Sequence, residues 1–341
     1  MAVKKVGIPR GLFYYKYYPF WKTFFDELGV ETVLSDMTNK KILDDGVKAC
    51  VDEACLPVKV YYGHVINLIG RVDYLLIPRY TSISKNEYVC PKFGGLPDMI
   101  RHTIKGLPEI IDVEVNFRKS SRNAFAPALK AGSIFCDDAK KIKSAFKKAK
   151  ASYREYCERI LDGIFPVDIL ERKLSVLKKS SEDTLNIAVI GHVYNIYDSY
   201  INMNMIDKLK SYKSNIITIE MINGEIINEE ASRLNKRMFW YFGRKAIGSI
   251  SYILKRNDID GIIYLMSFGC GIDSFICDLS ERRVRRAGDI PFMVLTIDEH
   301  SGQAGMDTRL EAFIDMVRWR KKYDSNVSAY GEYLHYGKGS S

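Results

Sequence analysis

The sequence predicts an α/β protein made of two open parallel sheets with a helical region between them. Short runs of aliphatic and β-branched residues alternate with longer runs that have helical spacing. This alternation occurs twice, and a helical, lysine-rich stretch separates the two occurrences. Strands that alternate with helices usually pair in parallel, with the helices on the faces of the sheet. We therefore expect two similar domains and a connector.

The first domain is expected to span residues 1–135. Its helical runs are punctuated by glycine, since Gly11 opens the first run and Gly29 closes it. The predicted strands are 4–10, 30–36, 72–79 and 109–116. The predicted helices are 11–29, 39–50, 57–70 and 96–106.

A basic helical connector is expected over 136–184, and a polar stretch at 178–184 ends its periodicity. The second α/β domain is expected over 185–325, followed by a flexible tail over 326–341. Its predicted strands are 185–191, 215–222, 261–267 and 291–298. Its predicted helices are 198–212, 226–255, 273–287 and 303–323.

Composition places the chain among globular proteins, with 47% hydrophobic and 27% charged residues in 341. No apolar run reaches the ~20 residues that span a bilayer, and the N-terminus lacks a signal-peptide pattern. We expect a cytoplasmic protein without a membrane partner.

Much of the net charge of +9 falls in the stretch 140–160. This stretch is either a solvated helix face or a dock for an acidic partner or a polyphosphate. No nucleic-acid reader motif accompanies the charge, so a nucleic-acid partner is not expected.

Three of the seven cysteines lie where ligands of parallel sheets are expected, in loops after strands. They are Cys55, Cys90 and Cys270, and each is flanked by Pro or Gly at the start of a helix or turn. A thiolate at a helix N-terminus is stabilised by the helix dipole and by free N–H groups. Gly269 and Gly271 would let a bulky metal group approach the backbone. The residues alone favour the alternative of three buried apolar cysteines, which is the common environment of free cysteine, and no C-x-x-C motif is present.

Long motifs that resemble a known family shift this balance toward metal ligation. The stretches "TNKKILDDGVKACVDEACLPVKVYYGHV", "CPKFGGLPDMIR", "FGCGIDSF" and "LTIDEHSGQAGMDTRLEAF" resemble the acyl-CoA dehydratase activase-related proteins. These are relatives of the 2-hydroxyacyl-CoA dehydratase subunits and of the double-cubane cluster proteins. The resemblance implies two flavodoxin-like (Rossmann-like) domains and a [4Fe–4S] cluster between them. Cys55, Cys90 and Cys270 match the three cluster cysteines of these relatives.

The resemblance also implies a reaction and partners. An ATP-dependent activase would supply a low-potential electron, and the chain would use it to reduce or dehydrate an acyl-CoA or another small substrate. It would act as an (R)-2-hydroxyacyl-CoA dehydratase-like lyase or as a reductase component, in a homo- or heterodimer, under anaerobic conditions. The sequence has no G-x-x-x-x-G-K-[ST] motif, so we interpret the chain as the electron acceptor and not as the ATPase.

Other interpretations remain open at this point. A double-cubane [8Fe–9S] cluster would need further thiols, and the nearest in sequence are Cys50, Cys277 and Cys136. A non-catalytic cluster carrier or maturation partner, or a metal-free ligand-binding module, would also have this pattern. Glu299 and His300 follow the last predicted strand and either move protons near the site or cap the turn.

Overall fold

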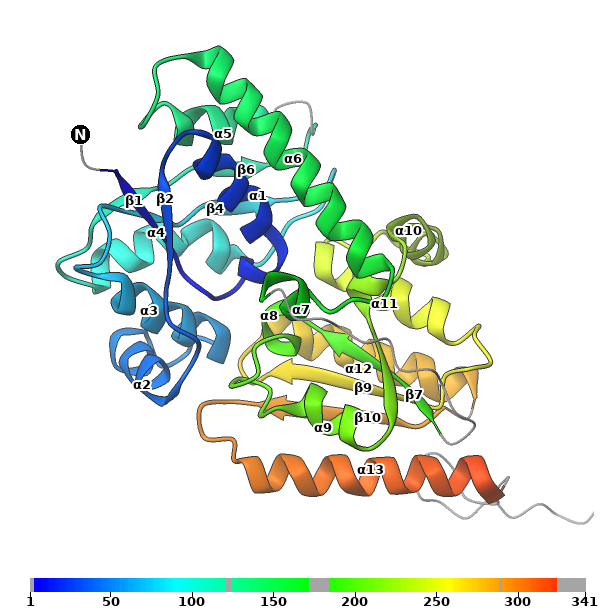
Figure 1. The fold of residues 1–341 in the computed structure, drawn as a ribbon. Coiled ribbons are helices and arrows are strands. Elements are labelled where there is room, and N and C mark those ends of the chain that lie inside the picture. Colours follow the sequence, from blue (N-terminus) through cyan, green and yellow to red (C-terminus); the bar gives the residue numbers. More distant parts are fainter. Residues whose placement is uncertain (1–2, 121–123, 172–183, 289, 324–341) are drawn as a thin grey trace, which may run out of the picture. The chain divides into compact units, whose positions relative to one another are not determined.

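Short strands form two four-stranded parallel sheets and one small two-stranded parallel sheet in the computed structural model (Figure 1). The structure describes residues 3–120, 124–171, 184–288 and 290–323. Residue contacts divide the chain into two compact units. The first comprises Met1–Ser175 and Lys236–Arg244, and the second comprises Val176–Asn235 and Lys245–Ser341.

The first unit contains a four-stranded sheet and a small two-stranded one, both parallel. The main sheet has the order β2-β1-β3-β5. Its strands are β1 (Lys5–Ile8), β2 (Glu31–Leu34), β3 (Tyr74–Leu76) and β5 (Glu109–Ile111). The small sheet pairs β4 (Arg79–Ser82) with β6 (Glu114–Asn116). The helices are α1 (Tyr14–Glu27), α2 (Lys40–Ala49), α3 (Leu56–Leu68), α4 (Pro91–Thr103), α5 (Phe125–Gly132), α6 (Ala139–Leu161) and α7 (Pro166–Leu170).

The second unit contains a four-stranded parallel sheet of order β10-β9-β7-β8. Its strands are β7 (Leu185–Gly191), β8 (Ser214–Thr218), β9 (Gly261–Ser267) and β10 (Phe292–Ile297). Its helices are α8 (Val193–Ile196), α9 (Met205–Ser211), the 3-10 turn η2 (Ile219–Met221), α10 (Gly224–Ser232), α12 (Gly271–Ala287) and α13 (Gln303–Tyr323). Helix α11 (Tyr241–Ile253) begins in residues assigned to the first unit and continues in the second.

The two main sheets share one strand order. In each unit the first and third strands in sequence are neighbours at the centre, and the second strand lies beside the first. This is the flavodoxin-like order, in which ligands bind where the chain switches from one side of the first strand to the other. The predicted fold class is therefore confirmed. The switch points lie between β1 and β3 in the first unit and between β7 and β9 in the second.

One predicted helix is two helices in the structure. The predicted single helix over 226–255 is wrong, because α10 ends at Ser232 and α11 begins only at Tyr241. Most of the predicted boundary at 178–184 and the whole predicted tail at 326–341 lie outside the described residues. The predicted domain ranges stay a prediction. Among the helices that the structure describes, none is both long and apolar enough to cross a membrane.

A buried histidine joins α3 to the loop after β2. The side chain of His64 is fully buried, and its Nδ1 and Nε2 lie 2.9 Å and 3.0 Å from the hydroxyl oxygens of Ser35 and Thr38. Burial, with a smaller effect of the Arg10 charge, lowers the pKa of His64 to about 3. The imidazole is therefore neutral in the folded protein at neutral pH.

This histidine makes the first unit sensitive to acid. The folded pKa lies below the ordinary value of 6.5, so the unfolded chain binds the proton first and stability falls as the pH drops below about 6.5. The expected loss is about 2 kcal/mol at pH 5. In denaturant titrations, His64→Gln should weaken this decline between pH 7 and pH 5, whereas His102→Gln, at an exposed position, should not. Equal slopes for both variants would contradict the assignment.

Candidate functional site

Two of the predicted cysteines begin helices of the first unit. Cys55 is the N-cap of α3, with φ −68° and ψ 154°, and a proline follows in the first turn. Cys90 is the N-cap of α4, with φ −53° and ψ 133°, and Pro91 is the first helical residue. Proline is favoured at this position because its missing N–H would have no helical partner. Both thiols therefore lie where a helix presents free N–H groups and its positive end.

A lysine connects the two helix starts. Lys92, in the first turn of α4, donates from Nζ to the carbonyl of Glu53 at 3.3 Å, in the loop that leads to Cys55. Burial raises the pKa of Cys90, while the backbone N–H and the positive charge of Lys92 act in the opposite direction. A cation at this place favours the thiolate form that binds metals.

The third thiol of this region, that of Cys50, is less accessible to a metal than the thiols of Cys55 and Cys90. Cys50 ends α2, and only 8% of its surface is exposed. Burial raises the pKa of Cys50, and the backbone N–H of Val51 and the charges of Lys59 and Lys92 partly oppose this. Cys50 lies close enough to Cys55 for the two thiols to influence each other electrostatically.

Aromatic side chains surround a small cavity at the switch point of the first unit. Its walls include Ile8 at the end of β1 and Leu76 at the end of β3, and its volume is about 40 Å³. The ring centroids of Phe13 and Phe93 lie 4.8 Å apart there, and Phe93 is three residues beyond Cys90. The aromatic run at the start of α1 therefore packs against the beginning of α4. The cavity has room for a few small groups.

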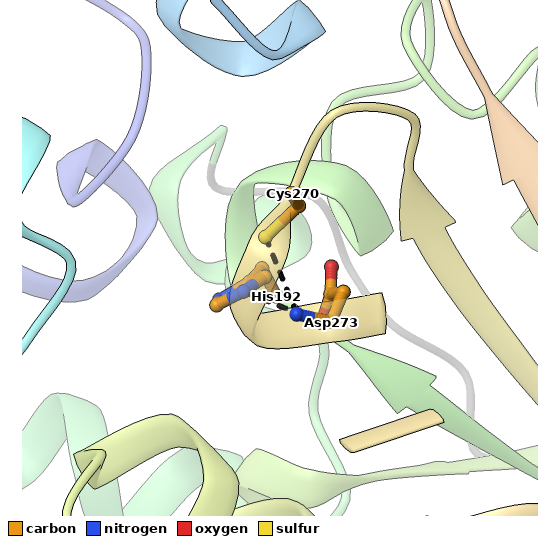
Figure 2. Close-up of side chains that lie close together, drawn as sticks. All are labelled: His192, Cys270 and Asp273. Carbon is orange, nitrogen blue, oxygen red and sulfur yellow. Dashed lines mark hydrogen bonds and ion pairs between the residues drawn. The ribbon is translucent and has the colours of Figure 1, made fainter. Parts of the chain in front are cut away.

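In the second unit, Cys270 is the N-cap of α12, after the loop that leaves β9. The backbone N–H of Asp273 donates to Cys270 Sγ over 3.5 Å (Figure 2). Gly269 has φ +74°, a conformation that side chains strongly disfavour. A Cβ on Gly271 would meet no atom within 4 Å, so its glycine is not required by packing. Of the two predicted glycines, the loop geometry therefore requires only Gly269.

Two further side chains join Cys270, as Figure 2 shows. His192 follows β7 directly and is the N-cap of α8, and its Nε2 lies 3.5 Å from Asp273 Oδ1. The ligand atoms of His192, Cys270 and Asp273 all lie within 4.8 Å of one another. Burial lowers the pKa of His192 to about 3 and raises that of Asp273 to about 7. The imidazole is thus neutral at neutral pH.

Sequence reasoning missed this pair. Neither His192 nor Asp273 is among the site residues that the sequence predicts. The available signal was position, because His192 stands directly after a buried apolar strand, where sheet ligands gather. His192 and Cys270 are far apart in the sequence, so no local pattern indicates that they are close in space. Their proximity depends on the pairing of β7 with β9.

The other predicted thiols are not members of these clusters, although Cys277 is close enough to Asp273 for the two groups to interact electrostatically. Cys277 is buried two turns along α12, and burial, with a smaller effect of the Asp273 charge, raises the pKa of its thiol to about 12. Cys136 lies in the loop between α5 and α6, where its thiol contacts the carbonyl of Asp138 at 3.8 Å. Neither thiol is part of the group around Cys270.

The turn after β10 is held by its own polar groups. Asp298 Oδ1 accepts from the N–H of His300 at 3.0 Å and from the hydroxyl of Ser301 at 2.8 Å. His300 is exposed and Glu299 is half-buried. This capping accounts for Asp298, and the proton-transfer role of Glu299 and His300 stays a prediction.

Comparisons with known proteins agree with the resemblance seen in the sequence. A family model described as the CoA enzyme activase uncharacterised domain (DUF2229) matches residues 5–222. A second model, of the 2-hydroxyglutaryl-CoA dehydratase D-component, matches residues 184–317. No curated protein matches the chain.

Matches among solved structures include the periplasmic zinc-binding protein TroA from Treponema pallidum, at 11% identity. The match covers 93% of this chain and 99% of TroA, with a TM-score of 0.24, which is too low to bear on fold or function. The family models are more specific, and the first covers well over half of the chain. The chain belongs to the CoA enzyme activase uncharacterised domain family and is an activase-related protein of the 2-hydroxyacyl-CoA dehydratase group.

Proposed function

We propose that the chain is an iron–sulfur redox component of a dehydratase system, with Cys55, Cys90 and Cys270 as ligands of a [4Fe–4S] cluster. The observation that carries this proposal is the shared position of the three thiols, since each is the N-cap of a helix in a flavodoxin-like unit. Helix N-termini supply N–H groups that donate to sulfur and favour negative charge, as cluster ligation requires.

The donor chemistry favours three ligands over the six of a double-cubane cluster. Cys55, Cys90 and Cys270 are each partly exposed, whereas Cys50 and Cys277 are buried. Cys136 contacts its own loop carbonyl. Accessible thiols with nearby N–H groups are the ones that form thiolate ligands readily. The proposal therefore takes the smaller [4Fe–4S] cluster.

Other residues of the chain would neutralise the charge of the cluster, exclude water from it and move protons. Lys92 would offset negative charge beside Cys55 and Cys90, and the aromatic rings around Phe93 would exclude water from this side. Glu299 and His300 would exchange protons with the substrate. When bound, the cluster would deliver a low-potential electron to the thioester carbonyl of an acyl-CoA. An ATP-dependent activase would supply that electron, and a like or related subunit would complete the assembly.

Iron and sulfide analysis after anaerobic purification or reconstitution tests the ligand assignment. We expect about four irons and four sulfides per chain, and a paramagnetic resonance signal of the reduced protein. Separate Cys55→Ser, Cys90→Ser and Cys270→Ser variants should each lose most of the iron and most of the sulfide. Cys136→Ser and Cys157→Ser, at half-buried thiols outside the proposed set, should retain them.

A Cys270→Ser variant with unchanged iron and an unchanged signal would show that the ligand assignment is wrong. About eight irons per chain would replace the proposed cluster with the double-cubane one. Turnover of acyl-CoA compounds in the presence of an activase, ATP and a reductant tests the enzymatic role separately. A loaded protein that turns over no acyl-CoA would instead be a carrier.

A further inference from the structure

The group around Cys270 lies at the switch point of the second unit. β7 and β9 are neighbours at the centre of the sheet, and His192 follows β7 while Cys270 follows β9. In open parallel sheets this place, at the carboxyl ends of the two central strands, is where ligands bind. Residues far apart in the sequence thus contribute side chains to one point.

These side chains offer a mixed set of metal ligands. An imidazole nitrogen, a thiol sulfur and a carboxylate oxygen lie within 4.8 Å of one another. The distance of 3.5 Å between His192 Nε2 and Asp273 Oδ1 is close to the separation of two ligand atoms in a tetrahedral site, where bonds are about 2.0–2.3 Å long. Nitrogen, sulfur and oxygen together suit Zn²⁺ or Fe²⁺ better than Mg²⁺ or Ca²⁺.

The carboxylate is buried with one oxygen unsatisfied. Asp273 has no exposed surface, and its Oδ1 accepts from the hydroxyl of Tyr264 at 3.2 Å. Its Oδ2 has no hydrogen-bond partner among the described residues. A buried carboxylate with an oxygen that lacks a donor is costly, and a cation bound by this carboxylate through either oxygen would lower that cost.

Neighbouring groups orient the three side chains. The ring of His192 stacks on that of Tyr194, with centroids 4.8 Å apart and an interplanar angle of 10°. The Tyr264 hydroxyl holds Asp273, and the Asp273 N–H donates to Cys270 Sγ. Metal ligands are commonly fixed by such outer contacts.

We propose that His192, Cys270 and Asp273 form a mononuclear site for a divalent transition metal of the Zn²⁺ or Fe²⁺ class. Three protein ligands leave a fourth position for water or a substrate oxygen, the arrangement of catalytic zinc sites. The site is complete within the second unit and shares only Cys270 with the proposed cluster. The bound ion and the cluster would therefore be alternative occupants of this thiol.

Cobalt titration of the full-length, metal-depleted protein tests the site under anaerobic conditions, with Co²⁺ alone as the probe. We expect one Co²⁺ per chain, a thiolate-to-cobalt charge-transfer band, tetrahedral ligand-field bands, and displacement by Zn²⁺. Cys270→Ser should abolish the charge-transfer band. His192→Ala and Asp273→Asn should each weaken binding at least tenfold, and circular dichroism would verify that each variant is folded.

Matched controls separate this site from the cluster. Cys277→Ser, on the same helix, should bind Co²⁺ as the unmodified protein does. Cys55→Ser and Cys90→Ser should also keep Co²⁺ binding, although they should lose the iron–sulfur cluster. The proposal is overturned if no thiolate band forms, if folded His192→Ala and Asp273→Asn bind Co²⁺ normally, or if Cys55→Ser and Cys90→Ser abolish the band. None of these results depends on whether the cluster forms.

Discussion

Gly63→Ala is expected to destabilise the first unit by about 3 kcal/mol or more, the upper range for overpacking a core. Helices α2 and α3 cross with their backbones in contact at two glycines. A Cβ on Gly63 would lie 1.8 Å from the carbonyl oxygen of Ile42, and a Cβ on Gly46 would lie 1.9 Å from that of Lys59. Backbone atoms cannot rotate away as a side chain can, so the helices would have to separate. Urea or thermal unfolding of the full chain measures the loss.

The matched control for this prediction is Gly95→Ala in α4. The nearest atom to a Cβ on Gly95 is the sulfur of Met99, at 4.0 Å, so alanine should be neutral or stabilising by up to about 1 kcal/mol. The loop between α2 and α3 carries Cys50 and Cys55. Gly63→Ala should therefore also reduce iron binding, whereas Gly95→Ala should not. Equal stability of the two variants would contradict the close helix crossing.

Most of the fold follows from local pattern. The predicted strands 185–191 and 261–267 have the observed bounds of β7 and β9. Both are central strands with long apolar runs, which is the strongest signal that a parallel sheet gives. The helix predicted over 303–323 also has the observed bounds of α13. Because the β-α alternation occurs twice in the sequence, it was sufficient to predict two parallel sheets with the same kind of fold.

Local pattern failed where distant contacts or special turns decide the structure. The predicted helix over 226–255 is interrupted between Ser232 and Tyr241, and at the end of this break Trp240 forms a β-bridge with Tyr88, a pairing that no local periodicity reveals. The predicted start of the fourth helix, at residue 96, was five residues late. Pro91 is the first helical residue, and Gly94 and Gly95, which have low helix propensity, both lie within the helix.

The position of the three thiols at helix starts was predictable, the neighbours of Cys270 were not, and the ligand role of the thiols stays a prediction. Flanking proline and glycine marked the loops of Cys55, Cys90 and Cys270, and the structure places all three at helix N-caps. The partners of Cys270 depend instead on the order of the strands. His192 reaches the site because β7 pairs with β9, and strand order is a property of the folded chain.

Arg244→Met is expected to cost about 3 kcal/mol, the lower end for removing one partner of a buried ion pair, because the buried carboxylate of Glu87 would keep, among the described residues, only Arg237, whose Nη2 lies 3.6 Å from its Oε1. Glu87 is only 1% exposed, and Arg244 donates from Nε to its Oε1 at 2.5 Å. The pair joins two segments that also pair through their backbones, since the N–H of Tyr88 donates to the carbonyl of Phe239 at 3.1 Å. Because Tyr88 lies two residues before Cys90, loss of the ion pair should also disturb the start of α4. Urea unfolding and iron content measure the two effects.

A double variant separates the buried charge from other consequences of losing the arginine. Glu87→Gln removes the charge but keeps the shape, so Arg244→Met combined with Glu87→Gln should recover a large part of the lost stability. Lys22→Met is the matched surface control, because its ion pair with Asp26 is half-exposed on both sides. Such pairs contribute about 0–1 kcal/mol, so this change should be small. If the double variant is no more stable than Arg244→Met alone, Arg244 holds the segment through its other contacts and not by neutralising Glu87. The stability of the Cys90 loop would then depend on packing around residues 236–244, with little contribution from the buried ion pair.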